Sequence, residues 1–471
     1  MTGRAARVGH VERRLLRSGI CLAVACFAFA APAAHGENLS EALARAYQTN
    51  PQLNAERARQ RATDENVSQA LSGYRPQIAA NLSAGLQAVR DLLPSNTIQS
   101  ANLKPWTVGV TVTQTLFNGF KTANSVRVAE LQVQSGREAL RNVGQGVLLD
   151  AVTVYTNVLA NQSLVEAQRA NVAFLQETLG ITQKRLNAGD VTPTDTAQAE
   201  SRVSRGLADL NAAQVALAIS KEIYAQVIGE PAVGLTAASP VDRLIPPSQT
   251  ASIDAASHEH PAVLGAGYDV DVATTSIKLA ESALLPQVSV QGNVSRQVQD
   301  DPTLSVQKND QASIVGQINV PIYDGGMAAS QTRQAKEVAS QSRLVLEQVR
   351  NQTRTAVVSA WVTNEGTKVA LTAAESEVHS AEVALQGVRR EAAGGQRTTI
   401  DVLNAQQDLT NARSRLIGAQ RDRVIASYTL LSAVGRLDTH TLNLNTPDYS
   451  PDVHYFQVRD AWHGLRTPSG Q

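Results

Sequence analysis

A unit of about two hundred residues occurs twice in this chain, and the duplication limits the possible folds more than any other feature. Residues 185–195 (RLNAGDVTPTD) lie between two long helical patterns and return as residues 391–401 (EAAGGQRTTID). The register holds at an offset of 206, which becomes 210 further upstream. The matched pairs include Gly189 with Gly395, Asp195 with Asp401, Tyr155 with Trp361, Gly229 with Gly435, and Pro76 with Pro286. Fold and function are therefore interpreted from the repeat.

Residues 1–36 have the pattern of a signal peptide. A basic region is followed by an apolar run from Ile20 to Ala31, and small residues continue to Gly36, where we expect cleavage. The run is too short to span a bilayer as a helix. Both cysteines, Cys21 and Cys26, lie in this segment, so no thiol chemistry is expected in the exported chain. A lipidated Cys26 is the less favoured alternative.

The charge balance of the exported chain is mildly acidic. Removal of five arginines and one glutamate with residues 1–36 leaves 37 basic and 41 acidic residues from the original 42 of each. This balance argues against nucleic acid as a partner. Beyond the signal peptide no run of eighteen apolar residues occurs, so any part inserted in a membrane must consist of strands.

Four segments alternate between apolar and small polar residues. They cover residues about 77–89, 105–117, 287–299 and 311–322, and each is about eleven residues long, as in a transmembrane β-strand. A half-buried soluble hairpin would show the same alternation. The export signal and the lack of other core material favour the membrane. Four strands cannot close a barrel, and open edges are not tolerated in lipid, so several copies must share one barrel.

Long helices follow the strands in both repeats. Residues about 120–188 and 327–392 contain no proline, and about seventy residues of helix extend about 100 Å. Apolar residues recur every seven positions, from Ala151 through Val158 and Val165 to Leu186, and a second seam includes Leu148 and Tyr155. Two seams predict a neighbouring helix on each side. Return helices are expected over about 193–229 and 398–434, and shorter helices over about 52–74 and 261–284.

These patterns divide the chain into five parts. The signal peptide at 1–36 is followed by the first repeat at 37–229, a proline-rich linker at 230–251 and the second repeat at 252–435. The tail at 436–471 has no counterpart in the repeat. It is rich in aromatic residues, so we expect its first half to pack on the helices.

Little in the sequence indicates catalysis. There is no glycine-rich phosphate loop, nucleophile elbow or HExxH motif, so we expect neither an enzyme nor a cofactor. His258-Glu259-His260 resembles a pair of metal ligands. It precedes Pro261 where the first repeat has Asn50-Pro51, however, and capping of the next helix explains it better. No metal site is predicted.

Polar residues and glycines mark two kinds of turn. The turns from strand to helix contain Asn118 and Gly119 in the first repeat, and Asp324 and Gly325 in the second. The turns between the long and the return helices carry Thr194, Asp195, Arg397 and Asp401. If copies surround an axis, these tips converge, and an Asp–Arg pair between neighbours could close the opening. The alternative is a solvated turn with ordinary capping side chains.

The order and spacing of these features resemble the TolC-like outer-membrane exit ducts. The resemblance rests on the two repeats, on Phe117-Asn-Gly and Tyr323-Asp-Gly-Gly, and on Gly395-x-x-Thr-x-x-Asp-Val-Leu-Asn-Ala405, and it covers about residues 38–440. The tail sequence Tyr449-Ser-Pro-Asp-Val-His-Tyr, with Ala-Trp-His-Gly464 after it, is similar to the branch that serves type I protein secretion.

This resemblance implies a mainly helical fold with a membrane β-barrel. The family forms homotrimers in the outer membrane, with a twelve-strand barrel to which each copy gives four strands. That barrel continues into a twelve-helix α-barrel in the periplasm. The implied partners are outer-membrane lipid, a periplasmic adaptor and an inner-membrane pump of the ABC or RND type. No cofactor is implied, and substrates pass through without chemistry.

Carried over by position, the resemblance also implies a periplasmic gate. Arg397 would bond around Thr194 and Asp195, and Asp401 would surround the constriction. The adaptor would dock on the tips, formed by Gly189, Asp190, Gly394 and Gly395.

Two positions depart from the family pattern. The family's gate tyrosine falls on Ala392, and its deeper acidic ring falls on Asn404. We therefore predict a less tightly latched and less cation-selective opening.

The function that the sequence favours is a passive exit duct of a tripartite export system, most simply for type I secretion. An outer-membrane component of RND-type multidrug efflux is the alternative within the same fold. A structural periplasmic coiled coil is an alternative of another class, which the four strands disfavour. A stand-alone porin is disfavoured by the long helices, because porins close on strands alone. The sequence leaves the cargo, the pump and the adaptor open.

Overall fold

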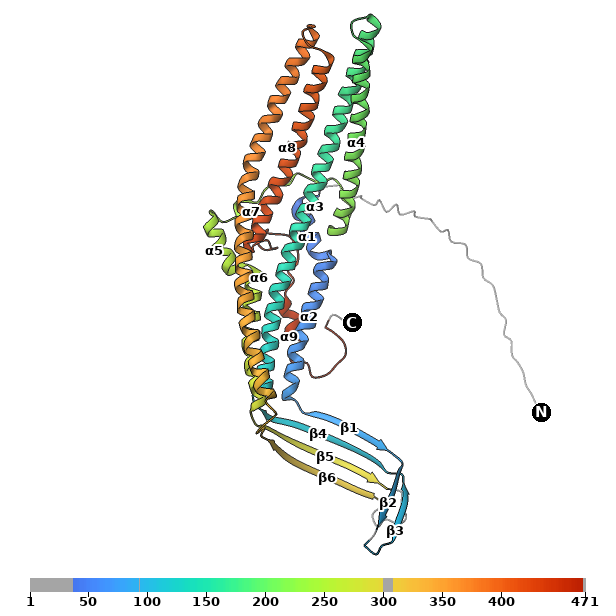
Figure 1. The fold of residues 1–471 in the computed structure, drawn as a ribbon, viewed down its shortest axis with the longest axis vertical. Helices are drawn as coiled ribbons and strands as arrows, with labels where there is room; N and C mark the ends of the chain where they lie inside the picture. Colours follow the sequence, from blue (N-terminus) through green and yellow to red (C-terminus); the bar gives the residue numbers. More distant parts are fainter. Residues whose placement is uncertain (1–36, 93, 300–307, 469–471) are drawn as a thin grey trace, which may run out of the picture.

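The computed structural model describes residues 37–92, 94–299 and 308–468; the predicted signal peptide, with Cys21 and Cys26, lies outside them. Figure 1 shows an elongated molecule with long helices at one end and an antiparallel sheet at the other. Both repeats contribute to both ends, since each contains a helical hairpin and two strands of the sheet. The fold is therefore mainly helical with a small sheet, as the sequence predicted.

The helices of the two repeats correspond one to one. The first repeat has α1 (Leu39–Thr49), α2 (Pro51–Leu71), α3 (Lys121–Ala188) and α4 (Pro193–Ile228). The second repeat has α5 (Gln249–Glu259), α6 (Pro261–Glu281), α7 (Met327–Ala393) and α8 (Thr399–Val434). The tail adds α9 (Pro451–Val458), and 3-10 turns occur at η1 (Ser72–Tyr74), η2 (Asp242–Leu244) and η3 (Ser282–Leu284).

Local chemistry explains the break between the two short helices of each repeat. Pro51 and Pro261 occupy the first turns of α2 and α6, where a missing N–H costs nothing. The side chain of Asn50 accepts from the backbone N–H of Gln52 at 2.9 Å. In the second repeat the N–H of Ala262 donates to Nδ1 of His260 at 3.1 Å. The histidine that resembled a metal ligand is therefore a helix cap.

The helices pack side by side as a wall, and near the tips α4 also contacts α8. In the half near the sheet the neighbours run in the order α2, α3, α6 and α7, and in the half near the tips the order is α4, α3, α8 and α7. The short helices α1 and α2 follow α4 end to end along α3 (Figure 1). The main core lies where the two halves meet. It is formed by residues of α1, α3, α4 and α8, including Leu43, Val152, Tyr155, Tyr224 and Leu431.

Among the helices of the described residues, α3 contains an 18-residue window apolar enough to cross a membrane. Of that window, 56% is buried inside the protomer. The apolar seams that pack on neighbouring helices account for it.

The main sheet has four antiparallel strands in the order β1, β4, β5, β6. They are β1 (Gln77–Ala84), β4 (Trp106–Asn118), β5 (Gln287–Val298) and β6 (Lys308–Asn319). A separate hairpin of β2 (Gln87–Leu92) and β3 (Ile98–Leu103) extends beyond the sheet. Neither β1 nor β6 pairs on its outer side among the described residues, so the sheet ends in two open edges.

Two strand boundaries differ from the sequence prediction, and proline explains both. The strand predicted over about 77–89 stops at Ala84, and a second one starts at Gln87. Gly85 donates to the carbonyl of Pro105 at 2.9 Å, but Pro105 has no N–H to return the bond. The last strand, predicted over about 311–322, runs from Lys308 to Asn319 because Pro321 interrupts it.

The two faces of the sheet differ in polarity. Apolar side chains remain exposed on one face, with Ile78 at 69%, Val110 at 44% and Ile314 at 84% exposure. The opposite face carries small polar residues such as Thr111, whose hydroxyl donates to Oδ1 of Asn293 at 3.2 Å. An exposed apolar face on one side and a polar face on the other is typical of strands between lipid and a lumen.

Candidate functional site

The tips of the two helical hairpins form the candidate site, at the end of the molecule far from the sheet (Figure 1). A glycine with positive φ follows each long helix: Gly189, at 83°, caps α3, and Gly395, at 76°, comes one residue after Gly394, which caps α7. The next residue closes the turn in each case: Asp190 donates to the carbonyl of Arg185 and Gln396 to that of Glu391, both at 2.9 Å. The duplicated sequence thus gives two backbone turns of the same kind.

Both return helices begin with the same capping box. The N–H of Asp195 donates to the hydroxyl of Thr192, while the carboxylate of Asp195 accepts from the N–H of Thr192 at 2.9 Å. Asp401 and Thr398 repeat this arrangement, also at 2.9 Å. The hydrogen bonds from the threonine backbone hold the pKa of both carboxyls below the usual range. The carboxylates predicted for the gate thus have a capping role within the protomer.

Arg397 bonds within its own hairpin. Its Nε donates to Oε2 of Glu391 at 2.9 Å, and this ion pair raises the pKa of the guanidinium. The structure therefore brings Arg397 to Glu391 and not to Thr194 or Asp195 of the same protomer. Figure 1 shows the α3–α4 tip and the α7–α8 tip apart from each other. Any bond from Arg397 to Thr194 or Asp195 has to be made to another copy.

The two hairpins are joined a short way below the tips by Arg202 and Asn404. Nη2 of Arg202, on α4, donates to Oδ1 of Asn404, on α8, at 2.9 Å. Asn404 is one of the gate residues predicted from the sequence, and Arg202 is not. No local motif marks this arginine, because its partner lies 202 residues away and the contact depends on how α4 packs against α8.

A buried polar cluster joins α3 to α8. Nε2 of Gln406 and the hydroxyl of Thr410 both donate to Oδ1 of Asn171 at 3.1 Å. These three side chains are between 4% and 6% exposed. Such groups are costly to bury alone, so the cluster fixes how the hairpins align. The cluster was not predicted from the sequence, although one signal was present: the polar Asn171 directly precedes Val172, a residue of the apolar seam.

A hollow lies between the hairpins where the family pattern has its tyrosine. Its lining includes Phe174, Thr178, Arg389, Ala392 and Val402. The guanidinium of Arg389 lies over the ring of Phe174, 5.3 Å from the ring centre, which is within the limit of about 6 Å for a cation–π contact. The small side chain of Ala392 leaves the space open, and a cation–π contact between α7 and α3 lies beside it.

The predicted turns from strand to helix connect the sheet to the long helices. Nδ2 of Asn118 donates to the hydroxyl of Thr122 at 2.6 Å, and Gly119 adopts a φ of 64°. A Cβ at Gly119 would lie 2.5 Å from the carbonyl oxygen of Ser282, so only glycine fits. In the second repeat the carboxylate of Asp324 accepts from the N–H of Ala328 at 2.6 Å, and Gly325 has a φ of 74°.

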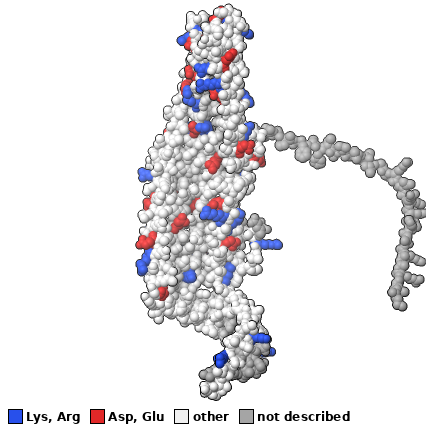
Figure 2. All heavy atoms as spheres, turned by 45° about the vertical axis from the view of Figure 1, so that its right-hand side comes forward, with Lys and Arg blue, Asp and Glu red and all other residues white. Residues whose placement is uncertain are grey.

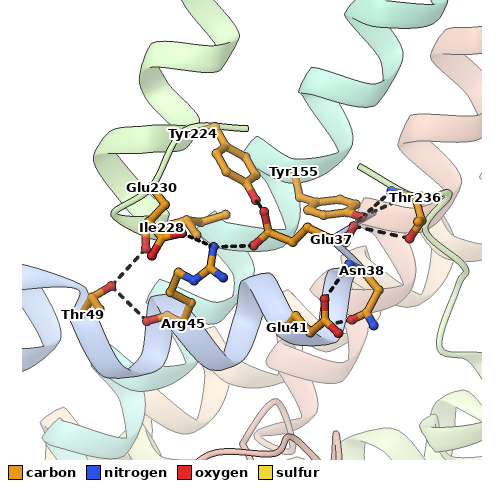
Figure 3. A network of polar contacts seen from close by, with 10 residues as sticks. All are labelled: Glu37, Asn38, Glu41, Arg45, Thr49, Tyr155, Tyr224, Ile228, Glu230 and Thr236. Carbon is orange, nitrogen blue, oxygen red and sulfur yellow. Dashed lines mark hydrogen bonds and ion pairs between the residues drawn. The ribbon is translucent and has the colours of Figure 1, made fainter. Parts of the chain in front are cut away.

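A second polar network lies in the middle of the wall (Figure 3). The hydroxyl of Tyr155 lies 2.8 Å from the carbonyls of Glu37 and Thr236, and Tyr224 donates to Oε2 of Glu37 at 2.8 Å. Nη1 of Arg45 lies 2.9 Å from Glu37 and 2.8 Å from Glu230. Burial raises the pKa of both tyrosines, which therefore stay neutral donors. The network ties the linker and the start of the described chain to α3 and α4.

Surface charge and the placement of possible metal ligands bear on whether the described residues form a nucleic-acid or metal site. On the face seen in Figure 2, basic and acidic side chains alternate along the helices, unlike the one-signed surfaces that bind nucleic acid. Within the residues that the structure describes, no group of three or more His, Cys, Asp or Glu is placed to hold a metal ion.

Comparison with known proteins identifies the family. The outer membrane efflux protein family matches residues 42–230 and 252–436, one match for each repeat. The chain is 38% identical to the outer membrane efflux protein BepC of Brucella suis, over 93% of this chain and 94% of the relative. It is 30% identical to the outer membrane protein TolC of Vibrio cholerae, over 85% and 91% of the two chains.

A solved structure shows the same fold. The Campylobacter jejuni CmeC outer membrane channel superposes with a TM-score of 0.76 at 15% identity and covers 90% of each chain. The resemblance to TolC-like proteins, the mainly helical fold with membrane strands, and the outer-membrane location are thereby confirmed. This chain belongs to the outer membrane efflux protein family, whose members are channels that extend from the outer membrane into the periplasm.

Proposed function

We propose that three copies of this chain form a passive exit duct that receives cargo from an inner-membrane pump through a periplasmic adaptor. The observation that supports it most is the four-stranded sheet with two open edges and one exposed apolar face. Open edges in lipid leave backbone groups unpaired, and pairing β1 of one copy with β6 of the next satisfies them.

The assembly is tested by the mass and location of the mature protein. We expect it in the outer-membrane fraction, and we expect light scattering in detergent, corrected for bound detergent, to give the mass of three chains. A folded monomer that is soluble without detergent would rule out the duct. It would favour instead a structural coiled-coil protein of the periplasm.

The gate is the second part of the proposal. Arg397 would bond to Thr194 and Asp195 of the neighbouring copy, in place of its bond to Glu391 or in addition to it. Asp401 would surround the constriction. Residue 392 is alanine where the family pattern has a tyrosine, and the hollow beside it is open. Both features support a weaker latch than in the family pattern.

Planar-bilayer conductance tests the latch. Arg397→Glu should raise the conductance of the closed state, because it places like charges at the tip. Arg169→Glu is the matched control, since Arg169 also pairs with a glutamate of its own hairpin, Glu166, at 2.8 Å but lies away from the tip. Equal conductance of wild type and Arg397→Glu would refute the latch.

Asn404 bears on ion selectivity. Arg202 places a cation beside Asn404, which supports the prediction of weaker cation selectivity. Arg202→Gln should therefore shift the reversal potential in a salt gradient toward greater cation preference. An unchanged reversal potential would remove Arg202 from the ion path.

The tips Gly189, Asp190, Gly394 and Gly395 are proposed to dock the adaptor. A photoreactive residue at Asp190 or Gly394 should cross-link to a periplasmic adaptor in intact cells, whereas the same residue at Gly366, in the shaft of α7, should not. Cross-links from Gly366 alone would place docking on the shaft.

The cargo is proposed from the tail and the relatives. The tail at 449–464 resembles the type I secretion branch, which favours a secreted protein. The relative BepC is named an outer membrane efflux protein, which favours efflux as the second candidate, and an RND-type pump is our proposal for it. Identification of the cross-linked adaptor, together with the pump encoded beside it, would decide between them.

A further inference from the structure

The C-terminal tail runs from the middle of the wall toward the sheet. Three contacts attach it to α2 and α3: His454 to Asp64 at 3.0 Å, Asp452 to Arg137 at 2.6 Å, and Arg459 to Glu130 at 3.7 Å. Val458 is only 3% exposed, so the end of α9 is also packed. The direction of the tail is thereby fixed before its last ten residues.

Two side chains of the first repeat then hold the tail at the beginning of the sheet. Nη1 of Arg75 donates to the carbonyl of Ala461 at 2.7 Å, and the hydroxyl of Ser68 lies 3.3 Å from the same oxygen. Arg75 is followed by Pro76, and β1 begins at Gln77. Because β1 presents the exposed apolar face of the sheet, Ala461 lies at the depth where that face begins.

Trp462, the residue after Ala461, exposes apolar surface at this depth. One face of the Trp462 ring lies over the guanidinium of Arg75, with the charge 4.8 Å from the ring centre, but the side chain is still 69% exposed. Leu465 is fully exposed at 103%. Arg459 and Arg466 flank this segment, with Asp460 as the carboxylate between them. Tryptophan with nearby arginine is the composition of a membrane–water interface.

Other aromatic residues lie at the same junction of helices and sheet. Tyr74, Phe120 and Tyr323 are 54%, 61% and 85% exposed, and each lies within a few residues of a strand end. Membrane barrels carry such aromatic girdles at both interfaces of the bilayer. Trp462 adds a ring to this girdle from a segment that is not part of the sheet.

We propose that the tail is an accessory membrane anchor: Trp462 enters the headgroup region of the periplasmic leaflet, and Arg75 fixes its depth. The partner is a phospholipid surface. The continuity with the apolar face of the sheet and the aromatic residues at the same junction favour lipid over a second protein surface.

Tryptophan fluorescence in lipid vesicles tests the anchor. The chain has three tryptophans, so Trp106→Phe with Trp361→Phe leaves Trp462 as the only emitter. The mature protein would be reconstituted in phosphatidylethanolamine–phosphatidylglycerol vesicles, with and without phospholipid brominated near the headgroup end of the acyl chain. We expect the brominated lipid to remove most of the Trp462 emission, and aqueous iodide to remove little.

The matched control is Trp106→Phe with Trp462→Phe, which leaves Trp361 in the shaft of α7. Trp361 is 34 residues beyond the start of α7, about 50 Å along the helix from the sheet, so brominated lipid should leave its emission unchanged. Arg75→Gln in the Trp462 background should shift the quenching from lipid toward iodide. Quenching of the Trp462 emission by iodide alone would place the ring in water and refute the anchor. Quenching by neither reagent would place the ring under a neighbouring copy and also refute it.

Discussion

The long helices of the two repeats have matched sequences, yet they bury different amounts of surface. Twenty residues of α3 are buried but only nine of α7, whereas α8 buries fourteen residues and the other return helix, α4, only seven. The reason is position: α3 and α8 lie inside the wall, and α4 and α7 lie at its two flanks. A duplicated unit thus has an inner copy and an outer copy of each helix.

The flanking helices keep apolar side chains exposed. On α4 these include Leu207 at 47% and Ile219 at 55%, and on α7 they include Leu344, Val362 and Val369 at 69%, 62% and 72%. Apolar surface of this extent on an otherwise solvated helix marks a contact with another chain. The comparison of the repeats therefore indicates that α4 of one copy meets α7 of the next.

Loss of assembly is the largest effect expected. Val362 and Val369 are seven residues apart on one stripe of α7, so Val362→Glu with Val369→Glu places two carboxylates in the interface between copies. Burial of an unpaired charge costs several kcal/mol, and the trimer should dissociate. Light scattering in detergent measures the mass. The pair Val362→Ala with Val369→Ala is the control and should remain trimeric; a trimeric glutamate variant would show that this stripe of α7 faces no other copy.

The second prediction compares Tyr155 with its repeat counterpart Trp361. Tyr155→Phe removes a hydroxyl that serves Glu37 and Thr236 in a buried site, which should cost about 1–3 kcal/mol. Trp361→Phe removes part of a half-buried ring that makes no described hydrogen bond, so its thermal midpoint should fall less. Circular dichroism in detergent measures both midpoints. An equal fall would mean that the network in Figure 3 adds no stability beyond packing.

Asn171 and its counterpart Glu377 give the third test. Asn171→Leu removes the acceptor through which Gln406 and Thr410 bond to α3 and leaves them only their contacts within α8, so the loss should be about 1–3 kcal/mol. Glu377 forms a solvent-exposed ion pair with Arg415, which water and salt screen, so Glu377→Gln should leave the thermal midpoint unchanged. A larger fall for Glu377→Gln would contradict the inner and outer assignment of the two helices.

The smallest effect concerns pH at the tips, where the two repeats should behave alike. In the folded protein the pKa values of Asp195 and Asp401 are lowered from the ordinary value of 3.8. The capping bonds therefore stabilise the tips fully above pH 3.8. They are lost as the pH falls below 3.8 and through the pKa values of the folded protein. Spin labels at Asp190→Cys and at Gln396→Cys should gain mobility together below about pH 3.8. A gain at one tip only would show that another contact holds the second tip.

The sequence predicted those parts of the fold that depend on local pattern. The seven-residue seams, Pro51 and Pro261, and Gly189 and Gly395 each act within a few residues, and the helices that they define were placed close to their observed ends. The strand boundaries were less accurate, because Pro105 and Pro321 break the ladder inside a continuing alternation.

The site was less predictable from the sequence, for a physical reason. The polar contacts between the hairpins join residues about two hundred positions apart, as in Arg202 with Asn404 and Asn171 with Gln406. Which polar side chain faces a partner depends on the rotation of one helix against another, and a few degrees per turn decide it. The roles of Arg397 and Asp401 between copies remain predictions, because a single protomer contains half of each contact.

The like geometry of the two tips has a consequence for whatever binds them. A partner that recognises the conformation of the main chain has two equivalent binding sites on every subunit, at Gly189 and at Gly395. A partner that recognises side chains meets Asp190 at one and Gln396 at the other and can tell them apart. The stoichiometry of the docked complex, one or two partners for each subunit, therefore reports which of these two features is recognised.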